Sequence, residues 1–315
     1  MKSRQITDHV LMVRPANFGF NSETAESNAF QTVNKVISDS EVSLRAIKEF
    51  DVFVSLLRSK GIQVTVIEDT SDPIKPDAVF PNNWFSTHRN GYIITYPVQA
   101  ELRRLERQEH IVDKLAETCD VQAVFPLENY EDYDQFLEGT GSMILDRDNR
   151  IVYACLSPRT NEVVLDKFCK LANFEKLVFN AIDGNNQDIY HTNVMMALGE
   201  DFVVICLETI KDPNQRKAIK EAFAKTGKTI IRISLDQMMA FAGNMLQLRN
   251  RRGERFLVMS SQAHDSLYPE QIQFIEQHTK ILHSPIKVIE TIGGGSVRCM
   301  MAEVFLKEKT EITGG

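Results

Sequence analysis

Short apolar runs recur along the chain at intervals of about 50 residues, a spacing typical of repeat architectures. The runs are GYIITYPV from Gly91, GSMILD from Gly141, NVMMALG from Asn193, GNMLQL from Gly243 and RCMMAEVF from Arg298. Most of them lead into a second apolar run, as IVYACLS, DFVVICLE and RFLVMSS do, through turn-forming DRDN, GED and NRRGE. The pattern predicts a series of β-hairpins.

A helical segment, with apolar residues three and four positions apart, follows most of these hairpins. In DPNQRKAIKEAFAKTG, Asp212 is a plausible N-cap, Pro213 occupies the first turn and Gly227 ends the helix. The segments NEVVLDKFCKLANF and YPEQIQFIEQHTKIL have the same character, and DVFVSLLRSKGIQVTVIED combines a helix with the strand after it. The helices lead into further strands, KLVFNAI, TIIRIS and IKVIET. The predicted unit is strand, strand, helix, strand, repeated about five times.

The repeats also indicate how the chain is divided into domains. No Pro/Gly/Ser-rich linker separates the units, which favours one closed α/β domain over residues 1–315. Stacked or radially arranged copies would cover one another's apolar faces. The alternative is an ordinary α/β sheet in which the spacing of the runs is a coincidence.

Composition narrows the class of protein. A chain of 315 residues can bury a core that needs no disulfide or metal, and a net charge of −7 argues against a nucleic-acid partner. No apolar stretch approaches the roughly 18 residues of a membrane span, and the N-terminus lacks the features of a signal peptide. The five cysteines form no C-x-x-C pair, so neither a zinc site nor a redox dithiol is expected. Free thiols without an export signal predict a cytoplasmic protein.

Polar and glycine-rich residues cluster at four places where predicted strands begin or end. In PDAVFPNNWFSTH, Asn82 and Asn83 offer four amide hydrogen-bonding groups, or form a structural Asx turn. In FLEGTGSMILD, Glu138 precedes two glycines, which would let a ligand approach the backbone closely. A surface glutamate in a turn is the alternative there.

The other two places carry a histidine and a cysteine. In DIYHTNVMMALG, His191 and Asn193 would point to one side of an extended chain, although a hydrogen-bonded core histidine is the alternative. In TIGGGSVRCMMAEVF, Cys299 follows a glycine run and Arg298, whose charge would favour a thiolate. A buried cysteine that acts only as a small hydrophobe is the alternative. Together the four places offer a nucleophile, an acid/base and an orienting carboxylate, as covalent catalysis by cysteine requires.

This set of residues resembles the guanidine-modifying enzymes, which are arginine deiminases, dimethylarginine dimethylaminohydrolases and amidinotransferases. Within this superfamily, the chain as a whole more closely resembles the citrulline-utilization hydrolase branch. The resemblance covers nearly all of the chain, and GGGSVRCM is its most specific piece. It implies a fivefold pseudosymmetric α/β propeller, or pentein, of strand-strand-helix-strand repeats, with no metal or organic cofactor.

The resemblance also assigns roles by position. It makes Cys299 the nucleophile, His191 the general acid/base and Glu138 the carboxylate that orients the histidine or the substrate. Further residues are expected to bind substrate: Asp77 and Asn244 line the pocket, Arg159 holds an α-carboxylate, and Asn82, Asn83 and Asn193 stand where deiminases place carboxylates around a guanidinium. Gly141 likewise replaces an acidic residue.

Neutral asparagines change the expected substrate. An amide both donates and accepts hydrogen bonds, which suits a ureido group better than a guanidinium. The predicted reaction is therefore the hydrolysis of citrulline to ornithine, ammonia and carbon dioxide, with a small amino acid as the ligand and neither nucleic acid nor membrane as partner. A homo-oligomer is left open.

Two other classes of function are compatible with parts of the sequence. Within enzymes, the alternatives are arginine deiminase, dimethylarginine dimethylaminohydrolase and amidinotransferase. Outside enzymes, some propellers of this shape are binding modules, such as ribosomal-subunit translation factors. A binding module would not need Cys, His and carboxylate together, and a ribosome binder would carry basic patches.

Overall fold

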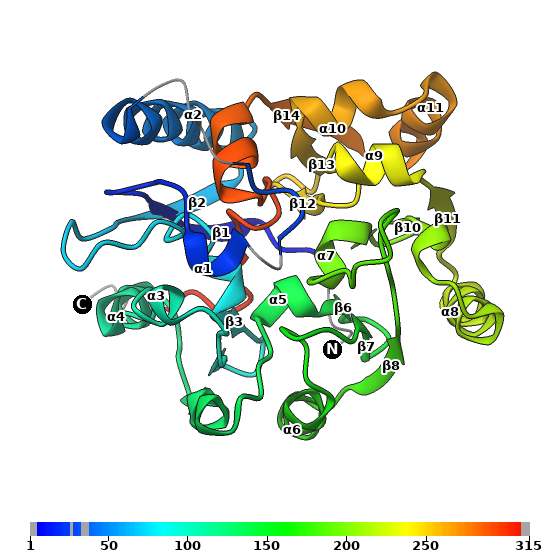
Figure 1. The fold of residues 1–315 in the computed structure, drawn as a ribbon, viewed down its shortest axis with the longest axis horizontal. Helices are drawn as coiled ribbons and strands as arrows, with labels where there is room; N and C mark the ends of the chain where they lie inside the picture. The colour runs from blue at the N-terminus through cyan, green and yellow to red at the C-terminus, as the bar shows by residue number, and fades with distance from the viewer. Residues whose placement is uncertain (1–4, 26–27, 33–37, 310–315) are drawn as a thin grey trace, which may run out of the picture.

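A computed structural model describes residues 5–25, 28–32 and 38–309. Five three-stranded sheets surround a central axis (Figure 1), each with the same internal order: the first strand pairs antiparallel with the second, and the second pairs parallel with the third. We call each sheet with its outer helix a blade. The predicted α/β propeller of five strand-strand-helix-strand units is thus confirmed, and the alternative of one ordinary sheet is wrong.

The strands of the five blades are short. The first, inner strands are β15 (Ala302–Glu303), β3 (Phe85–Thr87), β6 (Ile144–Asp146), β9 (Met196–Leu198) and β12 (Leu246–Arg249). The middle strands are β1 (His9–Arg14), β4 (Tyr92–Thr95), β7 (Ile151–Cys155), β10 (Phe202–Ile205) and β13 (Arg255–Ser260). The outer strands are β2 (Gln63–Glu68), β5 (Ala123–Pro126), β8 (Glu175–Phe179), β11 (Thr229–Arg232) and β14 (Lys280–Ser284).

One long helix connects the middle strand to the outer strand in each blade. These helices are α2 (Asp39–Ser59), α4 (Glu109–Thr118), α6 (Glu162–Ala172), α8 (Pro213–Lys225) and α11 (Pro269–His278). The predicted cap of α8 is present, because the Asp212 side chain accepts a hydrogen bond from the Asn214 N–H at 2.7 Å. Shorter helical segments are α1 (Ser22–Ala25), α3 (Glu101–Arg104), α5 (Gly139–Ser142), α7 (Thr192–Met195), α9 (Leu235–Met239), α10 (Ser261–Ser266), 3₁₀ turns at Pro81–Asn83 (η1), Glu128–Tyr133 (η2) and Leu207–Thr209 (η3), and a π-helix at Ile289–Gly293 (η4).

The two ends of the chain close the ring. Strand β15, near the C-terminus, pairs antiparallel with β1, and Leu11 lies opposite Ala302. One blade is therefore built from both ends of the sequence, so the ring is held by backbone hydrogen bonds as well as by packing.

Two sequence-based assignments were wrong. The run from Gly91 was grouped with the first strands of the other units, but it forms the middle strand β4; the first strand of that blade is the preceding β3. The run IKVIET was predicted to be a strand. The outer strand of its blade is the earlier β14, and residues 289–293 form a π-helix. Short apolar runs of this kind fit several elements equally well.

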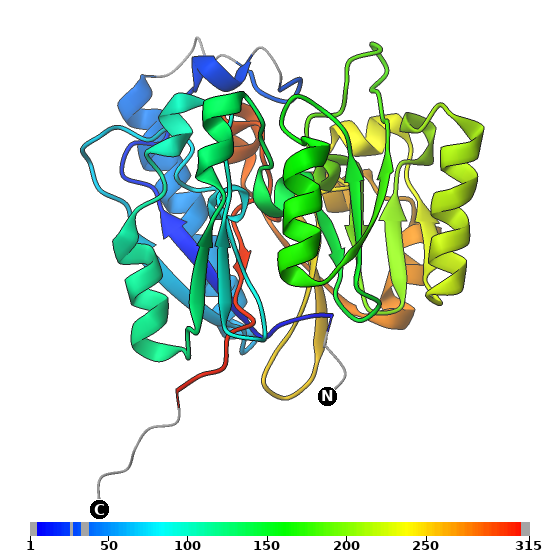
Figure 2. The ribbon, with the colours of Figure 1, turned by 90° about the horizontal axis from the view of Figure 1, so that it is seen from below.

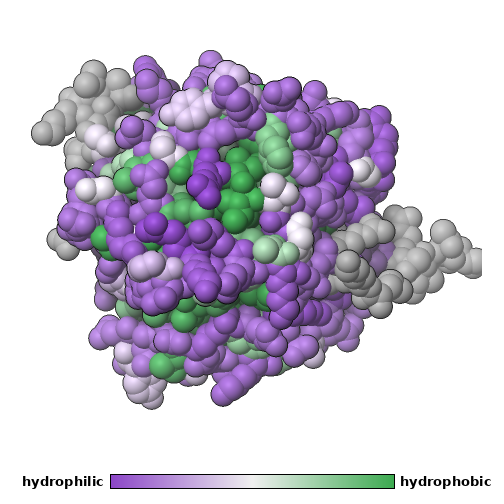
Figure 3. Space-filling model, turned by 90° about the vertical axis from the view of Figure 1, so that its right-hand side faces the viewer, coloured by the Kyte–Doolittle hydropathy of each residue, from purple (hydrophilic) through white to green (hydrophobic). Residues whose placement is uncertain are grey.

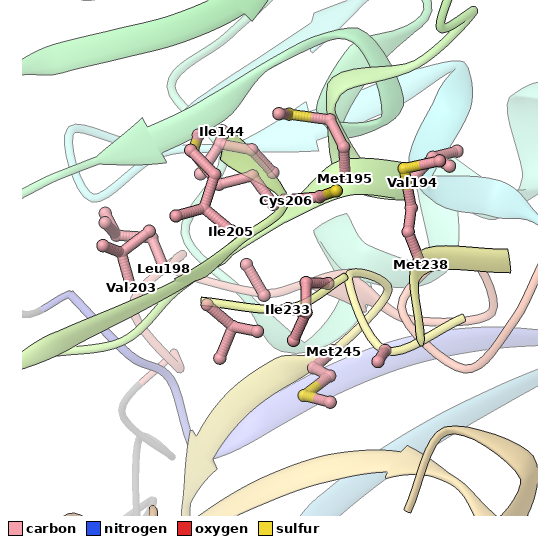
Figure 4. Close-up of a cluster of buried hydrophobic side chains, with 14 of the residues drawn as sticks. Ile144, Val194, Met195, Leu198, Val203, Ile205, Cys206, Ile233, Met238 and Met245 are labelled. Carbon is pink, nitrogen blue, oxygen red and sulfur yellow. The ribbon is translucent and has the colours of Figure 1, made fainter. Parts of the chain in front are cut away.

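Apolar side chains from neighbouring blades pack together around the axis. Figure 4 shows one such cluster, in which Ile144 of β6, Met195 of α7, Ile205 of β10 and Met245 before β12 meet. All are nearly inaccessible to solvent, and burial of such a side chain contributes about 1.5–3 kcal/mol. This packing holds α7 and the first strands of three blades in place beside the axis.

The outer helices turn polar faces to solvent. The face that carries α8 and α11 is mainly hydrophilic, with apolar side chains gathered near its middle (Figure 3). Among the described residues, no helix has both the length and the apolar character to cross a membrane. In the side view, α1 lies at one end of the molecule and the hairpin turn between β12 and β13 extends from the other (Figure 2).

Candidate active site

The predicted site residues come from segments that precede the inner strands. Glu138 lies directly before α5 and His191 directly before α7, while Asn83 belongs to η1 before β3. Gly139 makes the turn after Glu138 possible: its φ is +48°, and a Cβ there would lie 2.3 Å from the Asn82 carbonyl oxygen. Only glycine fits that conformation and space.

These segments line a small cavity near the axis. Of the residues predicted from the sequence, five line it: Asp77, Asn83, Arg159, His191 and Cys299. Asn193 and Asn244 lie behind Cys299 and contact its sulfur. Asn82 does not line the cavity, because its Nδ2 donates to the Thr140 hydroxyl at 3.2 Å.

A buried carboxylate–imidazole pair is the strongest polar contact in the site. His191 Nε2 lies 2.7 Å from Glu138 Oε2, and both side chains are almost fully buried. The second carboxylate oxygen of Glu138 accepts a hydrogen bond from the Gln99 N–H at 3.0 Å. Glu138 is thereby held from both sides and fixes the orientation of the imidazole ring.

Charge around this pair favours an ionised Glu138 and a neutral His191 at rest. Burial alone would raise the pKa of Glu138, but the field of Arg159, the hydrogen bond from His191 and Arg103 together lower it to about 2. Burial lowers the pKa of His191 below its usual value, although Glu138 opposes this. A neutral imidazole can accept a proton, and Glu138 can then stabilise the cation.

Among the described residues, the side chains that hydrogen-bond to the sulfur of Cys299 are the neutral amides of Asn193 and Asn244. Asn193 Nδ2 and Asn244 Nδ2 each lie 3.4 Å from Sγ, within hydrogen-bond reach. Asn244 is itself fixed, because its Oδ1 accepts from the Arg298 backbone N–H at 3.1 Å and its Nδ2 also donates to the Asn193 carbonyl at 3.0 Å. Both amides therefore present N–H groups to the sulfur.

Two details of the sequence-based argument about this region were wrong. Arg298 was expected to place positive charge beside Cys299, but its guanidinium turns away and pairs with Glu303 at 2.9 Å. His191 and Asn193 were expected to share one side of an extended chain, but Asn193 lies in the α7 turn. Its amide reaches the sulfur through that turn.

Sequence reasoning missed Arg103, a buried cation that lines the cavity. Its guanidinium makes two contacts with Glu106, at 2.9 and 3.0 Å, and donates to Asn83 Oδ1 at 2.9 Å. It also lies 3.9 Å from both Asp77 and Glu138. No motif marked Arg103, since it stands in the charged stretch ELRRLER, which has the composition of an ordinary solvated helix.

Fold and cavity together define the class: the chain is a five-bladed α/β propeller of the guanidine-modifying, or pentein, superfamily. Residues 14–306 match the family model described as N,N dimethylarginine dimethylhydrolase, eukaryotic. The chain belongs to that family. No curated protein matched the sequence.

Solved structures share the fold at low sequence identity. The apo structure of ArgZ, an arginine dihydrolase from the ornithine-ammonia cycle in Cyanobacteria, has a TM-score of 0.74 and 16% identity over 96% of this chain and 41% of ArgZ. Unliganded AgrE gives 0.73 and 17%, over 96% of this chain and 40% of AgrE. A dimethylarginine dimethylaminohydrolase adduct with S-methyl-L-thiocitrulline gives 0.64 and 15%, over 95% and 99%. The chain thus spans less than half the length of ArgZ and AgrE.

Gly141 stands where the superfamily resemblance led us to expect an acidic residue, and the structure explains why none fits. A Cβ at this position would lie 2.3 Å from Asn83 Nδ2 and 2.8 Å from His191 Cε1 and Nδ1. Any side chain would displace the imidazole or the amide. Asn83 and His191 therefore occupy the space that a second carboxylate would need.

Replacing Gly141 with alanine should lower the hydrolase activity about 100-fold, since small displacements of catalytic groups have effects of this size. The measurement is kcat for whichever substrate the wild-type protein turns over. Gly184→Ala is the matched control, because a Cβ there meets nothing within 4 Å. Equal activity of the two variants would contradict the close packing described for Gly141.

The glycine loop before Cys299 is anchored by a buried acid. The Ser296 hydroxyl donates to Glu290 Oε1 at 2.6 Å, and the Cys299 N–H donates to the Ser296 carbonyl at 2.9 Å. Burial raises the pKa of Glu290 to about 7, and the nearby carboxylate of Glu49 adds to this, while hydrogen bonds from Ser260 and Ser296 oppose it. Ionisation of Glu290 therefore acts against the folded loop.

This shift predicts a pH-dependent stability. Because the folded-state pKa lies above the usual 4.5, stability should decline as pH rises from about 5 to above 7. Glu290→Gln removes the ionisation and should be more stable than wild type at pH 8 by roughly 1–3 kcal/mol, with little or no gain at pH 5. Urea unfolding at both pH values measures this, and an equal effect at both would show that Glu290 does not titrate in this range.

Proposed function

We propose that the chain is a cysteine-dependent hydrolase that breaks a C–N bond in the ureido or guanidino group of a small amino acid, most specifically citrulline. One observation carries the proposal: Cys299 and His191 line the same cavity, and Glu138 holds His191 through a 2.7 Å contact. Nucleophile, proton carrier and orienting carboxylate are the groups that covalent catalysis by cysteine needs.

The proposed reaction has two halves. The Cys299 sulfur attacks the ureido carbon while His191 takes up the thiol proton. His191 then delivers this proton to the departing nitrogen, so that ornithine leaves and an S-carbamoyl cysteine remains. A water, activated by His191, hydrolyses that intermediate to carbamic acid, which breaks down to ammonia and carbon dioxide. Since Glu138 binds Nε2, the transferred proton is carried on Nδ1.

The amides of Asn193 and Asn244 would act on the nucleophile itself. Two N–H donors at 3.4 Å hold the sulfur in position for attack. They do so without a cation next to the sulfur. A neutral substrate, which brings no positive charge of its own, suits such a site.

The orientation of Asn83 supports a ureido substrate. Arg103 has only N–H donors, so the Asn83 amide must present Oδ1 to it and Nδ2 elsewhere. Among the described residues, Asn83 Nδ2 is buried with no hydrogen-bond partner, as are the acceptors Asp77 Oδ1 and Asn193 Oδ1. A ureido group has an oxygen for Asn83 Nδ2 and an N–H group for Asp77 Oδ1, and both of these residues line the cavity. A guanidinium has no acceptor for Asn83.

Arginine is the second candidate substrate. Asp77 supplies a carboxylate oxygen to the cavity, and a charge-assisted hydrogen bond to guanidinium would be strong. ArgZ, which shares the fold, is an arginine dihydrolase. Burial raises the pKa of Asp77, although Arg103, Asn21 and Arg159 oppose this, so a neutral Asp77 would bind guanidinium less well.

The remaining proposals concern the rest of the ligand and the protein. Arg159 lines the cavity, and we propose that it binds the α-carboxylate of the substrate. We also propose that residues 1–315 act as one catalytic domain in the cytoplasm, where the five free cysteines would stay reduced.

Incubation of the purified protein with citrulline, arginine and methylated arginines, followed by ammonia and ornithine assays, tests the function. Cys299→Ser and Cys299→Ala should abolish turnover and leave thermal unfolding nearly unchanged, because the side chain is small. Failure of all three substrate types would overturn the proposal, and turnover by Cys299→Ala would overturn the mechanism.

Labelling by iodoacetamide tests the nucleophile within the same experiment. Burial raises the pKa of Cys155 to about 12, and those of Cys169 and Cys206 to about 11, so these thiols should react slowly. Cys299 should be labelled first, and substrate should protect it. Faster labelling of Cys155 or Cys206 would contradict the assignment.

Asn83→Asp tests the choice between substrates. The carboxylate would face the ureido oxygen, so two hydrogen-bond acceptors would lie opposite each other. This should cost about 1–3 kcal/mol of transition-state stabilisation and lower kcat/KM for citrulline accordingly. The kcat/KM ratio of arginine to citrulline should rise. Asn82→Asp is the matched control, since it adds the same charge one residue away, outside the cavity. An unchanged ratio, or a wild-type preference for arginine, would remove citrulline and leave the hydrolase assignment intact.

A further inference from the structure

A second, small cavity lies at the ends of β3 and β6 that are remote from the active-site cavity. The hairpin turns after these two inner strands form most of its wall. Its principal lining residues are His88, Arg89, Arg147, Arg150, Phe174 and Phe305. Among the described residues, no aspartate or glutamate lines it, although the chain as a whole has a net charge of −7.

Arg147 is the buried floor of this cavity, with 5% of its surface exposed. Its guanidinium carbon lies 3.9 Å from the centre of the Phe305 ring. Within the described part of the chain, Nη2 has no hydrogen-bond partner. The carboxylate of Glu303 lies 3.9 Å from Nη2, but Arg298 binds it more closely, at 2.9 Å. Nη1 donates to the Thr87 carbonyl at 3.5 Å, the limit of a hydrogen bond, so the polar contacts that the described residues give this buried cation are long.

Two more guanidinium groups stand at the exposed rim. Arg150 donates to the Ala172 carbonyl at 3.2 Å and lies over the Phe174 ring. Arg89 lies over Phe305, the ring that Arg147 also covers. Asp148, within the same turn as Arg147 and Arg150, is not among the residues that line the cavity.

The pKa of the neighbouring His88 reflects the positive charge of these arginines. His88 is buried, and its Nε2 lies 2.9 Å from the Ser86 hydroxyl. Burial lowers the pKa of His88 well below its usual value, and the charges of Arg147 and Arg150 lower it further. His88 is therefore neutral, and the charge of the cavity comes from arginine.

We propose that this cavity binds a phosphate group, either as the free ion or as part of a small phosphate ester. Guanidinium groups pair with phosphate through parallel, charge-assisted hydrogen bonds. An oxyanion in this cavity would accept hydrogen bonds from the guanidinium groups of Arg147 and Arg150, which line it. The proposed hydrolase reaction makes no use of these residues, so the inference stands independently of it.

Thermal unfolding of the whole protein at constant ionic strength tests the proposal. Inorganic phosphate should raise the unfolding temperature in a saturable manner, because a ligand that binds only the folded state stabilises it. Chloride at the same ionic strength should not. Glycerol phosphate distinguishes the two sources: stabilisation by both compounds supports an ester site, and stabilisation by inorganic phosphate alone supports a site for the free ion. Stabilisation by neither overturns the proposal.

Substitutions show which cavity binds the phosphate. Arg150→Ala and Arg147→Met should weaken phosphate binding roughly tenfold or more, the value of one charge-assisted hydrogen bond. Arg252→Ala, in the hairpin turn of another blade and 77% exposed at its side chain, should bind as wild type does. Arg159→Ala should also retain the effect, which excludes the active-site cavity as its source. Loss of the phosphate effect in Arg159→Ala, or its retention in Arg150→Ala, would overturn the proposal. The Arg150→Ala variant provides this test even if Arg147→Met, at a buried position, fails to fold.

Discussion

The contact between Glu138 and His191 is the constraint on which the arrangement of the site depends. An ionised carboxylate that is fully buried requires several compensating partners, and Glu138 has them in His191, the Gln99 N–H and the nearby charges of Arg103 and Arg159. These partners come from three segments: residues 99–103 after β4, the segment around Arg159, and the start of α7. The position of one carboxylate thus fixes the α5 turn, the start of α7 and the segment after β4 relative to one another.

Charged and neutral side chains share the rest of the site: Asp77, Arg103 and Arg159 line the cavity, whereas amides contact the sulfur. Amide N–H groups meet the sulfur of Cys299, and an amide oriented by Arg103 meets the cavity. Arg103 donates a hydrogen bond to Asn83 Oδ1 and thereby fixes the orientation of that amide, so that Nδ2 points in another direction.

The order of strands and helices could be predicted because each blade repeats one local pattern, with hairpin turns such as DRDN and caps such as Asp212 to mark the boundaries. The superfamily resemblance predicted that Cys299, His191 and Glu138 belong to one catalytic site. It could not show that Asn82 points to Thr140 or that Asn193 and Asn244 hold the sulfur. Arg103 was missed because burial of a charged helix residue depends on tertiary partners that leave no local pattern.

The direction of Arg298 is the most instructive of these differences. Adjacent residues of the chain face different cavities: Cys299 lines the active-site cavity, whereas Arg298 lines a separate cavity with Gln247 and Glu303. The guanidinium is thereby paired with Glu303, away from the sulfur. A cation beside the thiolate would repel an incoming guanidinium, but amide donors stabilise the sulfur without that repulsion. The backbone turn at residues 298–299 therefore leaves the sulfur open to a guanidino as well as a ureido group, with the charge of the arginine used for the structure instead.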